Sequence, residues 1–318
     1  DFINAVLKLK AKKLYPGPVM ILLCSSVVSW VEKEMGNCIG TDAVKKIDQT
    51  IKLSNLNFLE VVRVLPDYPV SECIRVYGVI GGVTGYINHW NPKVDLKTNI
   101  CRQILSRNGY MYNKAENIIG ASLRELSVYD TILACIAGGC DKLNDLYLKT
   151  GFSRAKISVY MKNLAASDII EKAVSFETGG WENAKKGVYR IRDNYVNFWF
   201  RFIYKYRSAV EIGNMEYLYK VVERDYDTYS GIILEKYFRQ LFAESNEYSD
   251  IQGYWDNKGE NEIDLIAVND MEKRIVIGEV KRNAKRISLP LLERKAENII
   301  KKHSSYQIEF RGFSLEDM

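Results

Sequence analysis

The chain has 318 residues, of which 47% are hydrophobic and 27% charged, a composition typical of globular proteins with a substantial core. Its length predicts two or three folded units. Forty-five Lys and Arg against 40 Asp and Glu leave a formal net charge of +5, which by itself does not require a nucleic-acid partner. The longest apolar run, residues 19–28, is far shorter than the roughly 20 residues of a membrane helix, so we expect no membrane span.

The six cysteines contain no C-x-x-C pair, and only two histidines are present. This spacing argues against a zinc site and favours reduced thiols, and we expect a cytoplasmic protein. The sequence opens on Asp1 and passes at once into a helix-like stretch, which we interpret as an N-terminal truncation.

Residues 20–35 begin as an apolar run of strand length and end on polar residues that favour a helix. This pattern predicts a buried parallel strand of an α/β sheet. Ligands of such sheets bind beyond the carboxyl ends of the strands, where Ser25 and Ser26 would lie. The alternative is a serine-rich turn without a ligand.

Residues 77–87 contain four glycines, but no Lys-Ser or Lys-Thr pair follows them. The pattern G-x-x-x-x-G-K-[ST] is absent from the whole chain, so the backbone cradle and lysine of a P-loop are missing. We therefore do not expect this chain alone to hydrolyse ATP.

Between residues 128 and 193 the pattern predicts three helices followed by a hairpin, the order of a winged helix-turn-helix. Ser153 is the predicted N-cap of the third helix. Ile157, Met161 and Leu164 fall at i, i+4 and i+7, so they predict one buried stripe.

The opposite face of that third helix carries Arg154, Ser158 and Lys162. In a DNA-binding winged helix this face enters the major groove, and Lys185 and Lys186 in the wing would reach phosphates. Winged helices also serve as protein-packing modules, and this alternative stays open.

Aromatic residues dominate the segment that follows residue 193, with Phe198, Phe202 and Tyr206 at helical spacing. We favour a core-packing helix over a base-stacking platform.

The last unit begins near Gly231 with an amphipathic helix, and two strands follow over 262–268 and 274–282, joined by a short polar turn. Side chains alternate along a strand, so Glu279 and Lys281 project on one face, where Asp264 of the neighbouring strand joins them if the strand register allows it.

Two carboxylates in an apolar surround require a lysine or a metal ion. Mg²⁺ suits Asp264 and Glu279 because it takes few carboxylate oxygens and keeps waters for a phosphate substrate. Lys281 would orient the attacking water or stabilise the developing charge, and Glu235 of the preceding helix would add a carboxylate. The alternatives are an inactive nuclease fold and an ordinary surface ion pair.

These motifs resemble a known family in their order along the chain. They are ILLCSSVVSWVEKEM, YGVIGGVTGYI, the predicted winged helix, GVYRIRDNYVNFWFRF, GIILEKYFRQ, EIDLIAV and IVIGEVKR. Their order is similar to that of prokaryotic, archaeal-type AAA/STAND ATPases with a winged helix and a C-terminal PD-(D/E)XK nuclease-like domain of unknown function.

The resemblance implies that Glu235, Asp264, Glu279 and Lys281 fall on motif positions of the nuclease-like domain. It also implies that Ser25 or Ser26 lies near the γ-phosphate of ATP, in a longer parent protein whose Walker segments precede Asp1. The expected fold is an α/β and α+β multidomain protein. Its expected parts are the end of an ATPase domain at 1–70, a helical lid at 71–126, a winged helix at 127–193, a helical connector at 194–230 and a nuclease-like domain at 231–318.

The expected function is that of the C-terminal part of an ATPase with a DNA-binding winged helix and a Mg²⁺-dependent DNA endonuclease domain. The alternative is a non-catalytic DNA-binding or protein-interaction module with an inactive nuclease fold. A third hypothesis, favoured by the mild net charge, is an interaction protein that does not bind nucleic acid.

Overall fold

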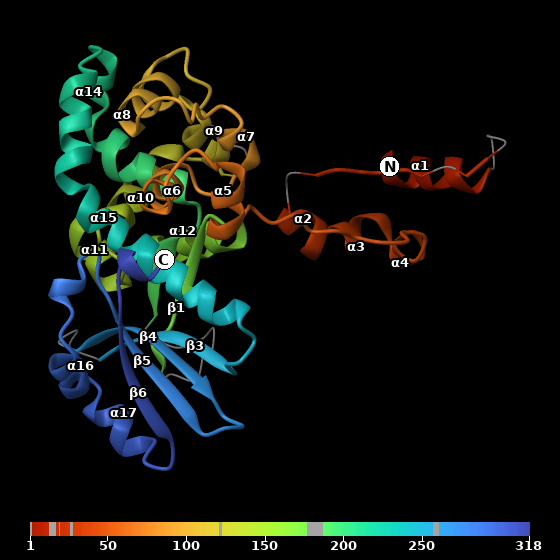
Figure 1. Ribbon diagram of the computed structural model, residues 1–318. Coiled ribbons are helices and arrows are strands. Elements are labelled where there is room, and N and C mark those ends of the chain that lie inside the picture. The colour runs from red at the N-terminus through yellow and green to blue at the C-terminus, as the bar shows by residue number, and fades with distance from the viewer. Residues whose placement is uncertain are drawn as a thin grey trace. The chain divides into compact units, whose positions relative to one another are not determined.

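The structure is a computed structural model that describes residues 2–12, 17–18, 20–25, 28–120, 123–176, 187–256 and 261–318 (Figure 1). The chain divides into two compact units. The first comprises Asp1–Ser54 and Ala166–Asp168, and the second comprises Asn55–Ala165 and Ile169–Met318. The first boundary thus falls at residue 54, where residue 70 was expected.

The described part of the first unit is helical, with α1 (Phe2–Ala11), α2 (Val28–Lys33), α3 (Met35–Ile39) and α4 (Thr41–Val44). Residues 20–25 form no strand, and their apolar side chains are exposed, Met20 by 81% and Leu22 by 74%. The prediction of a buried parallel strand was therefore wrong for these residues. A strand is buried only when others pair with it and cover it, and the described residues of this unit contain none.

Short helices open the second unit: α5 (Phe58–Val64), α6 (Val70–Ile80), α7 (Thr84–Ile87), α8 (Leu96–Asn99), a π-helical turn (Ile100–Leu105) and α9 (Lys114–Gly120). The paired glycines after α6 have a packing role. Gly81 adopts a positive φ of 61°, which glycine tolerates without strain. Gly82 accepts a backbone hydrogen bond from Leu56 at 2.9 Å.

Three helices and a hairpin follow in the predicted order: α10 (Leu126–Ala137), α11 (Leu143–Thr150), α12 (Arg154–Ala166), β1 (Ile170–Ala173) and β2 (Val188–Ile191). The strands are antiparallel, with Ile170 opposite Ile191. Ser153 accepts a hydrogen bond from the Lys156 N–H at 3.2 Å, which confirms the predicted cap. The stripe of Ile157, Met161 and Leu164 is buried as predicted.

The aromatic segment belongs to the core, as we favoured. It forms α13 (Asn194–Phe198), a π-helical turn (Trp199–Ile203), a 3₁₀ turn (Tyr204–Tyr206) and α14 (Arg207–Glu211). Phe198 and Phe202 are buried, and their ring centroids lie 5.0 Å apart. The next helix, α15, runs unbroken over Met215–Glu244. It therefore passes through the boundary expected between residues 230 and 231.

A mixed four-stranded sheet ends the chain, in the order β3-β4-β5-β6. Its strands β3, β4 and β5 are antiparallel neighbours, whereas β6 runs parallel to β5. The elements are β3 (Asp250–Trp255), β4 (Glu262–Asn269), β5 (Arg274–Val280), a 3₁₀ turn (Ala284–Arg286), α16 (Leu289–Lys295), α17 (Glu297–Lys302), β6 (Gln307–Phe313) and a 3₁₀ turn (Leu315–Asp317). The hairpin of β4 and β5 was predicted from sequence.

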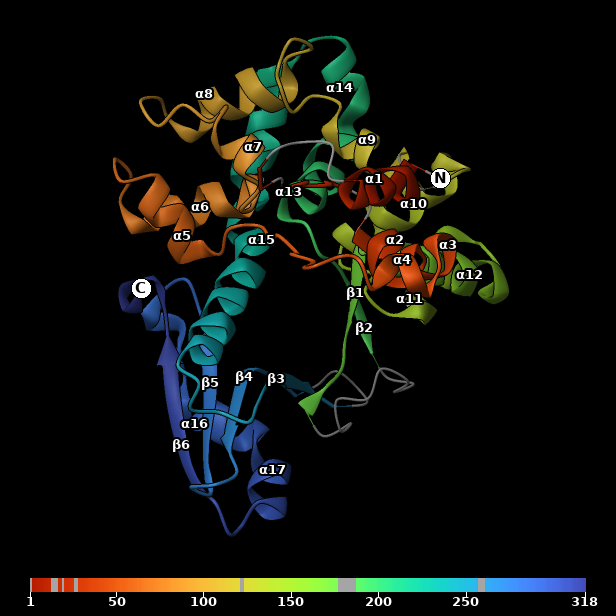
Figure 2. The same cartoon turned by 90° about the vertical axis from the view of Figure 1, so that its right-hand side faces the viewer.

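Helices cover both faces of this sheet (Figure 2). On one face Leu265 and Val276 pack against Phe242 of α15. On the other face Ile266 packs in a cluster with Leu292 of α16. Alternating residues of β4 thus enter two cores, which explains why the central strands are apolar almost throughout.

The β1–β2 hairpin is joined to the edge of the sheet. The Ser175 hydroxyl accepts a hydrogen bond from the Trp255 N–H and donates one to the Trp255 carbonyl, each at 2.9 Å. Phe176 is buried in the core of the sheet beside Tyr254 and Ile263. The hairpin and the sheet therefore belong to one packed unit.

None of the helices in the described ranges combines the length and apolarity that a membrane crossing needs. All six cysteines are free thiols.

Candidate functional site

The predicted site residues of the sheet lie together at one end of β4 and β5. Leu265 stands opposite Gly278 in the strand register, so Asp264 and Glu279 come next along the two strands. The Val280 N–H donates to Oδ2 of Asp264 at 2.7 Å. The side chains of Asp264 and Glu279 are only 11% and 6% exposed. The register therefore brings two buried carboxylates to the same place.

Lys281 lies between these carboxylates. Its Nζ donates to Oδ2 of Asp264 at 3.2 Å and lies 3.5 Å from Oε1 of Glu279. Burial by itself would lower the pKa of Lys281, but the charges of Asp264 and Glu279 outweigh burial and raise that pKa above its ordinary value. Its side chain is 37% exposed. Lys281 is therefore the member of this trio, formed by Asp264, Glu279 and Lys281, that solvent reaches.

Helix α16 adds two groups that sequence reasoning missed. The Ser288 N–H, just before the helix, donates to Oε2 of Glu279 at 3.0 Å. Lys295, at the end of α16, has its Nζ 3.8 Å from Oε1 of Glu279. Leu292 and Ile299 are buried, and Lys295 lies three residues after the first and four before the second. That helical spacing was the available signal that Lys295 faces the sheet.

Glu235 is not brought into contact with the other three site residues. It lies on α15, where Nη2 of Arg239 donates to its Oε2 at 2.8 Å. Nε of Arg239 donates to the Asp264 carbonyl at 2.9 Å, so the arginine links Glu235 to β4. Burial raises the pKa of Glu235, Arg239 opposes the rise, and the charge of Asp264 adds to it. Glu235 borders the trio without joining it.

Asp264 and Glu279 are the carboxylates of this site that a metal ion would use as ligands. Within the described residues, no group of three or more His, Cys, Asp or Glu side chains is placed to hold a metal. A cage made by the protein alone is therefore not present in that part of the chain. Mg²⁺ commonly binds through one or two carboxylates and completes its shell with water and phosphate oxygens. Asp264 and Glu279 supply two carboxylates, the number that this smaller requirement names.

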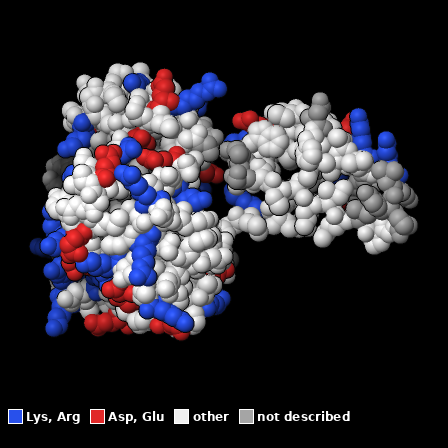
Figure 3. Space-filling view, turned by 90° about the horizontal axis from the view of Figure 1, so that it is seen from above, with Lys and Arg blue, Asp and Glu red and all other residues white. Residues whose placement is uncertain are grey.

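The face of α12 predicted to contact DNA is exposed at Arg154, Ser158 and Lys162. Arg154 also packs within its own unit, donating to Asn144 at 3.2 Å and lying 5.1 Å from the centroid of the Tyr147 ring. The predicted wing residues Lys185 and Lys186 lie outside the described residues. On the face seen in Figure 3, Lys and Arg are interspersed with Asp and Glu.

The predicted nucleotide contacts cannot be assembled as expected. Ser26 lies outside the described residues. Ser25 is described, but it stands in the exposed segment that forms no strand, so the strand end expected to carry it is missing.

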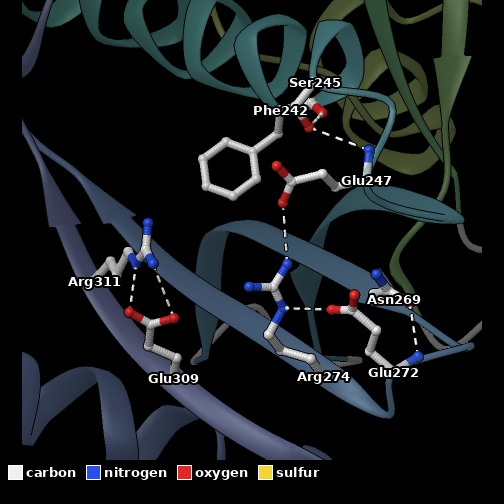
Figure 4. Close-up of polar contacts among 8 residues, drawn as sticks. All are labelled: Phe242, Ser245, Glu247, Asn269, Glu272, Arg274, Glu309 and Arg311. Atoms are coloured by element: carbon white, nitrogen blue, oxygen red, sulfur yellow. Dashed lines mark hydrogen bonds and ion pairs between the residues drawn. The ribbon is translucent and has the colours of Figure 1, made fainter.

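A hollow of about 410 Å³ is lined by Phe242 of α15, Tyr248 and Arg311 of β6. Arg311 is paired with Glu309 at 2.6 Å (Figure 4). Arg274, nearby, has its Nη2 3.0 Å from a carboxylate oxygen of Glu247. Because carboxylates of the same chain neutralise these guanidinium groups, the hollow has little charge left with which to bind an anion.

Residues 199–299 match a family described as archaea bacterial proteins of unknown function. The chain is 26% identical over 278 residues to the uncharacterized protein MJECL04 of Methanocaldococcus jannaschii. The chain resembles proteins of archaea and bacteria. The alignment covers 86% of this chain and 60% of MJECL04, so the chain spans about 60% of the length of that curated relative. No solved structure matches it significantly.

The segment that matches the family contains the whole candidate site. Glu235, Asp264, Glu279, Lys281 and Lys295 all fall within residues 199–299. Neither the family description nor the name of MJECL04 states an activity, so the ATPase and nuclease assignments remain predictions.

Proposed function

We propose that the C-terminal module of this chain is a Mg²⁺-dependent endonuclease of the PD-(D/E)XK type that hydrolyses phosphodiesters in DNA. The observation that carries the proposal is the convergence of Asp264, Glu279 and Lys281 at one end of two central strands. Burying two carboxylates at one place costs free energy that neighbouring lysines or a metal ion must offset, and such an arrangement is typical of a site that binds a cation.

Each residue has a distinct role in this proposal. Asp264 and Glu279 would hold the ion, and the Val280 and Ser288 N–H groups fix one oxygen of each carboxylate. The ion, when bound, supplies Lewis acidity that lowers the pKa of a bound water. Lys281, the exposed member of the trio, would turn toward the scissile phosphate and stabilise the charge that develops there. Glu235 and Arg239 would support β4 from the side of α15.

We further propose that α12 is the DNA-contacting helix, with Arg154, Ser158 and Lys162 toward the duplex. Its support is the exposed polar face opposite a buried apolar stripe.

The test is a cleavage assay with supercoiled plasmid, branched DNA and single strands, in Mg²⁺ and in Mn²⁺. We expect wild-type cleavage that is lost in Lys281→Ala and in Glu279→Gln. Lys301→Ala, which removes an exposed lysine of α17, is the matched control and should cleave normally. Cleavage that persists in Lys281→Ala would contradict the assignment of the trio.

A second candidate is a DNA-binding or protein-interaction module whose nuclease fold is inactive. The observation that favours it is that Lys281 and Lys295 already neutralise both carboxylates without any ion. This candidate predicts DNA binding that weakens as salt rises, with no cleavage at any Mg²⁺ or Mn²⁺ concentration. Fluorescence anisotropy over a salt series, alongside the cleavage assay, separates the two candidates.

A further inference from the structure

The candidate site contains equal numbers of acidic and basic side chains in direct contact. Asp264 and Glu279 supply two negative charges, and Lys281 and Lys295 supply two positive charges within 3.8 Å of them. Because the carboxylates are nearly buried, solvent screens these interactions less than it screens surface pairs. The site is thus electrically balanced before any ion arrives.

The two lysines stand in different relations to the carboxylates. Lys281 contacts both of them, so an ion bound to both would compete with its ammonium group for the same oxygens. Lys295 contacts Oε1 of Glu279 and lies too far from it for a strong hydrogen bond. The Ser288 N–H holds the other oxygen. The hydrogen bond from Ser288 therefore holds the Glu279 carboxylate in place without Lys295. Lys295 acts on this carboxylate through its charge.

We propose that the positive charges of Lys281 and Lys295 oppose the binding of a divalent cation to Asp264 and Glu279. We further propose that Lys295 sets the affinity of the site for that cation. This inference rests on the proposed function only in taking a divalent cation as the ligand. When the cation binds, Lys281 is displaced and becomes available to substrate. Lys295 stays beside Glu279 and repels the cation. Lys295 is thus a positioning and tuning residue, and not one that touches the reacting atoms.

The test measures Mn²⁺ binding to the full chain at one pH, by electron paramagnetic resonance of the free ion, with no DNA present. Lys295→Met should bind Mn²⁺ roughly tenfold more tightly than wild type, because a unit charge close to the ligand oxygen is removed. Lys295→Arg keeps the charge and should bind like wild type. Asp264→Asn should lose binding, which places the ion at this site.

Lys301→Met is the matched control. Lys301 also lies 3.8 Å from a glutamate oxygen, of Glu297, but its side chain is 74% exposed. Its removal should leave Mn²⁺ affinity unchanged. If Lys295→Met does not fold, Lys295→Gln replaces it, and thermal melts with and without Mn²⁺ must show a larger stabilisation by the ion than in wild type.

Unchanged or weaker binding by the Lys295→Met and Lys295→Gln variants overturns the inference, as does the absence of Mn²⁺ binding by every variant and wild type. The outcome is separable from that of the nuclease proposal. Tighter binding by Lys295→Met without DNA cleavage by wild type would support the opposing charge of Lys295 and reject the nuclease. DNA cleavage by wild type with no change in Mn²⁺ affinity would do the reverse.

Discussion

Arg239 links the candidate site to helix α15. Its guanidinium group reaches the Glu235 carboxylate and the Asp264 carbonyl at once. Both members of the ion pair are largely buried, and a buried charge that loses its partner is costly. The same residue therefore stabilises the fold and supports one strand of the site.

Arg239→Met should lower the free energy of unfolding by about 3 kcal/mol, because Glu235 would be left buried without its counter-charge. Urea denaturation followed by circular dichroism measures this change. Arg224→Met is the control, since Arg224 pairs with Asp225 at an exposed position, and it should hardly shift the midpoint. Equal midpoints for the two variants would contradict the structural role of Arg239.

Asp130 is a second residue whose surroundings change its pKa. Burial, with the nearby charge of Glu116, raises the pKa of Asp130 to about 6, although Arg207 opposes the rise. A carboxyl group whose pKa is raised by folding favours the folded state while it is protonated. Its contribution is complete below the unfolded pKa of about 4 and is lost as pH rises through about 6.

Asp130→Asn should therefore stabilise the protein at pH 8 by about 1 to 2 kcal/mol, after allowance for partial solvent screening. Near pH 4 the variant and wild type should be equally stable. Thermal melts over this pH range test the prediction, and a stability difference independent of pH would refute it.

At the scale of elements, Gly82 and Gly231 show that the effect of a glycine-to-alanine substitution on stability depends on where the glycine lies. A Cβ at Gly82 would lie 1.7 Å from the Leu56 carbonyl oxygen, whereas a Cβ at Gly231 meets nothing within 4 Å. The backbone at Gly82 packs directly against the backbone at Leu56, to which it is hydrogen-bonded, whereas Gly231 lies inside the long helix α15.

Gly82→Ala should destabilise the protein by about 3 kcal/mol because the backbone must move apart. Gly231→Ala should stabilise it by about 1 kcal/mol, since alanine favours a helix interior over glycine. Chemical denaturation of both variants gives the two values. A destabilised Gly231→Ala would show that α15 tolerates no side chain there.

At the scale of the whole molecule, the β1–β2 hairpin connects the three-helix segment to the sheet of the candidate site. Lys236, next to Glu235 on α15, lies 3.8 Å from Glu171 of β1, and Phe176 enters the core of the sheet. The two segments expected to be separate domains, at 127–193 and 231–318, therefore share packing contacts.

Phe176→Ala should remove about 3 kcal/mol of stability from the sheet, because a largely buried aromatic side chain is lost. Leu148→Ala is the control, since Leu148 is mostly exposed on α11. In wild type, unfolding followed by tryptophan fluorescence and by circular dichroism should coincide. A Phe176→Ala midpoint equal to that of Leu148→Ala would mean that the hairpin is not part of the core.

Local periodicity was sufficient to predict the elements that bury one face. The stripe of Ile157, Met161 and Leu164 and the alternation along β4 and β5 repeat within a few residues, so they are visible in sequence alone. Alternation also placed Glu279 and Lys281 on one face of a strand, but whether Asp264 joins them depends on the register of β4 and β5, which only the structure supplies. In contrast, the apolar run near Leu22 predicted a strand that did not form, because a strand depends on partners elsewhere in the chain.

The sequence by itself determined which residues alternate, which helices are amphipathic and which acidic and basic side chains share a strand face. Only the tertiary structure decided that Lys295 reaches Glu279, that Arg239 links Glu235 to β4 and that Phe176 enters the sheet. The physical reason is that side-chain periodicity is a property of neighbouring residues. The partners of a buried charge are set instead by how distant segments pack, and no local pattern records that packing.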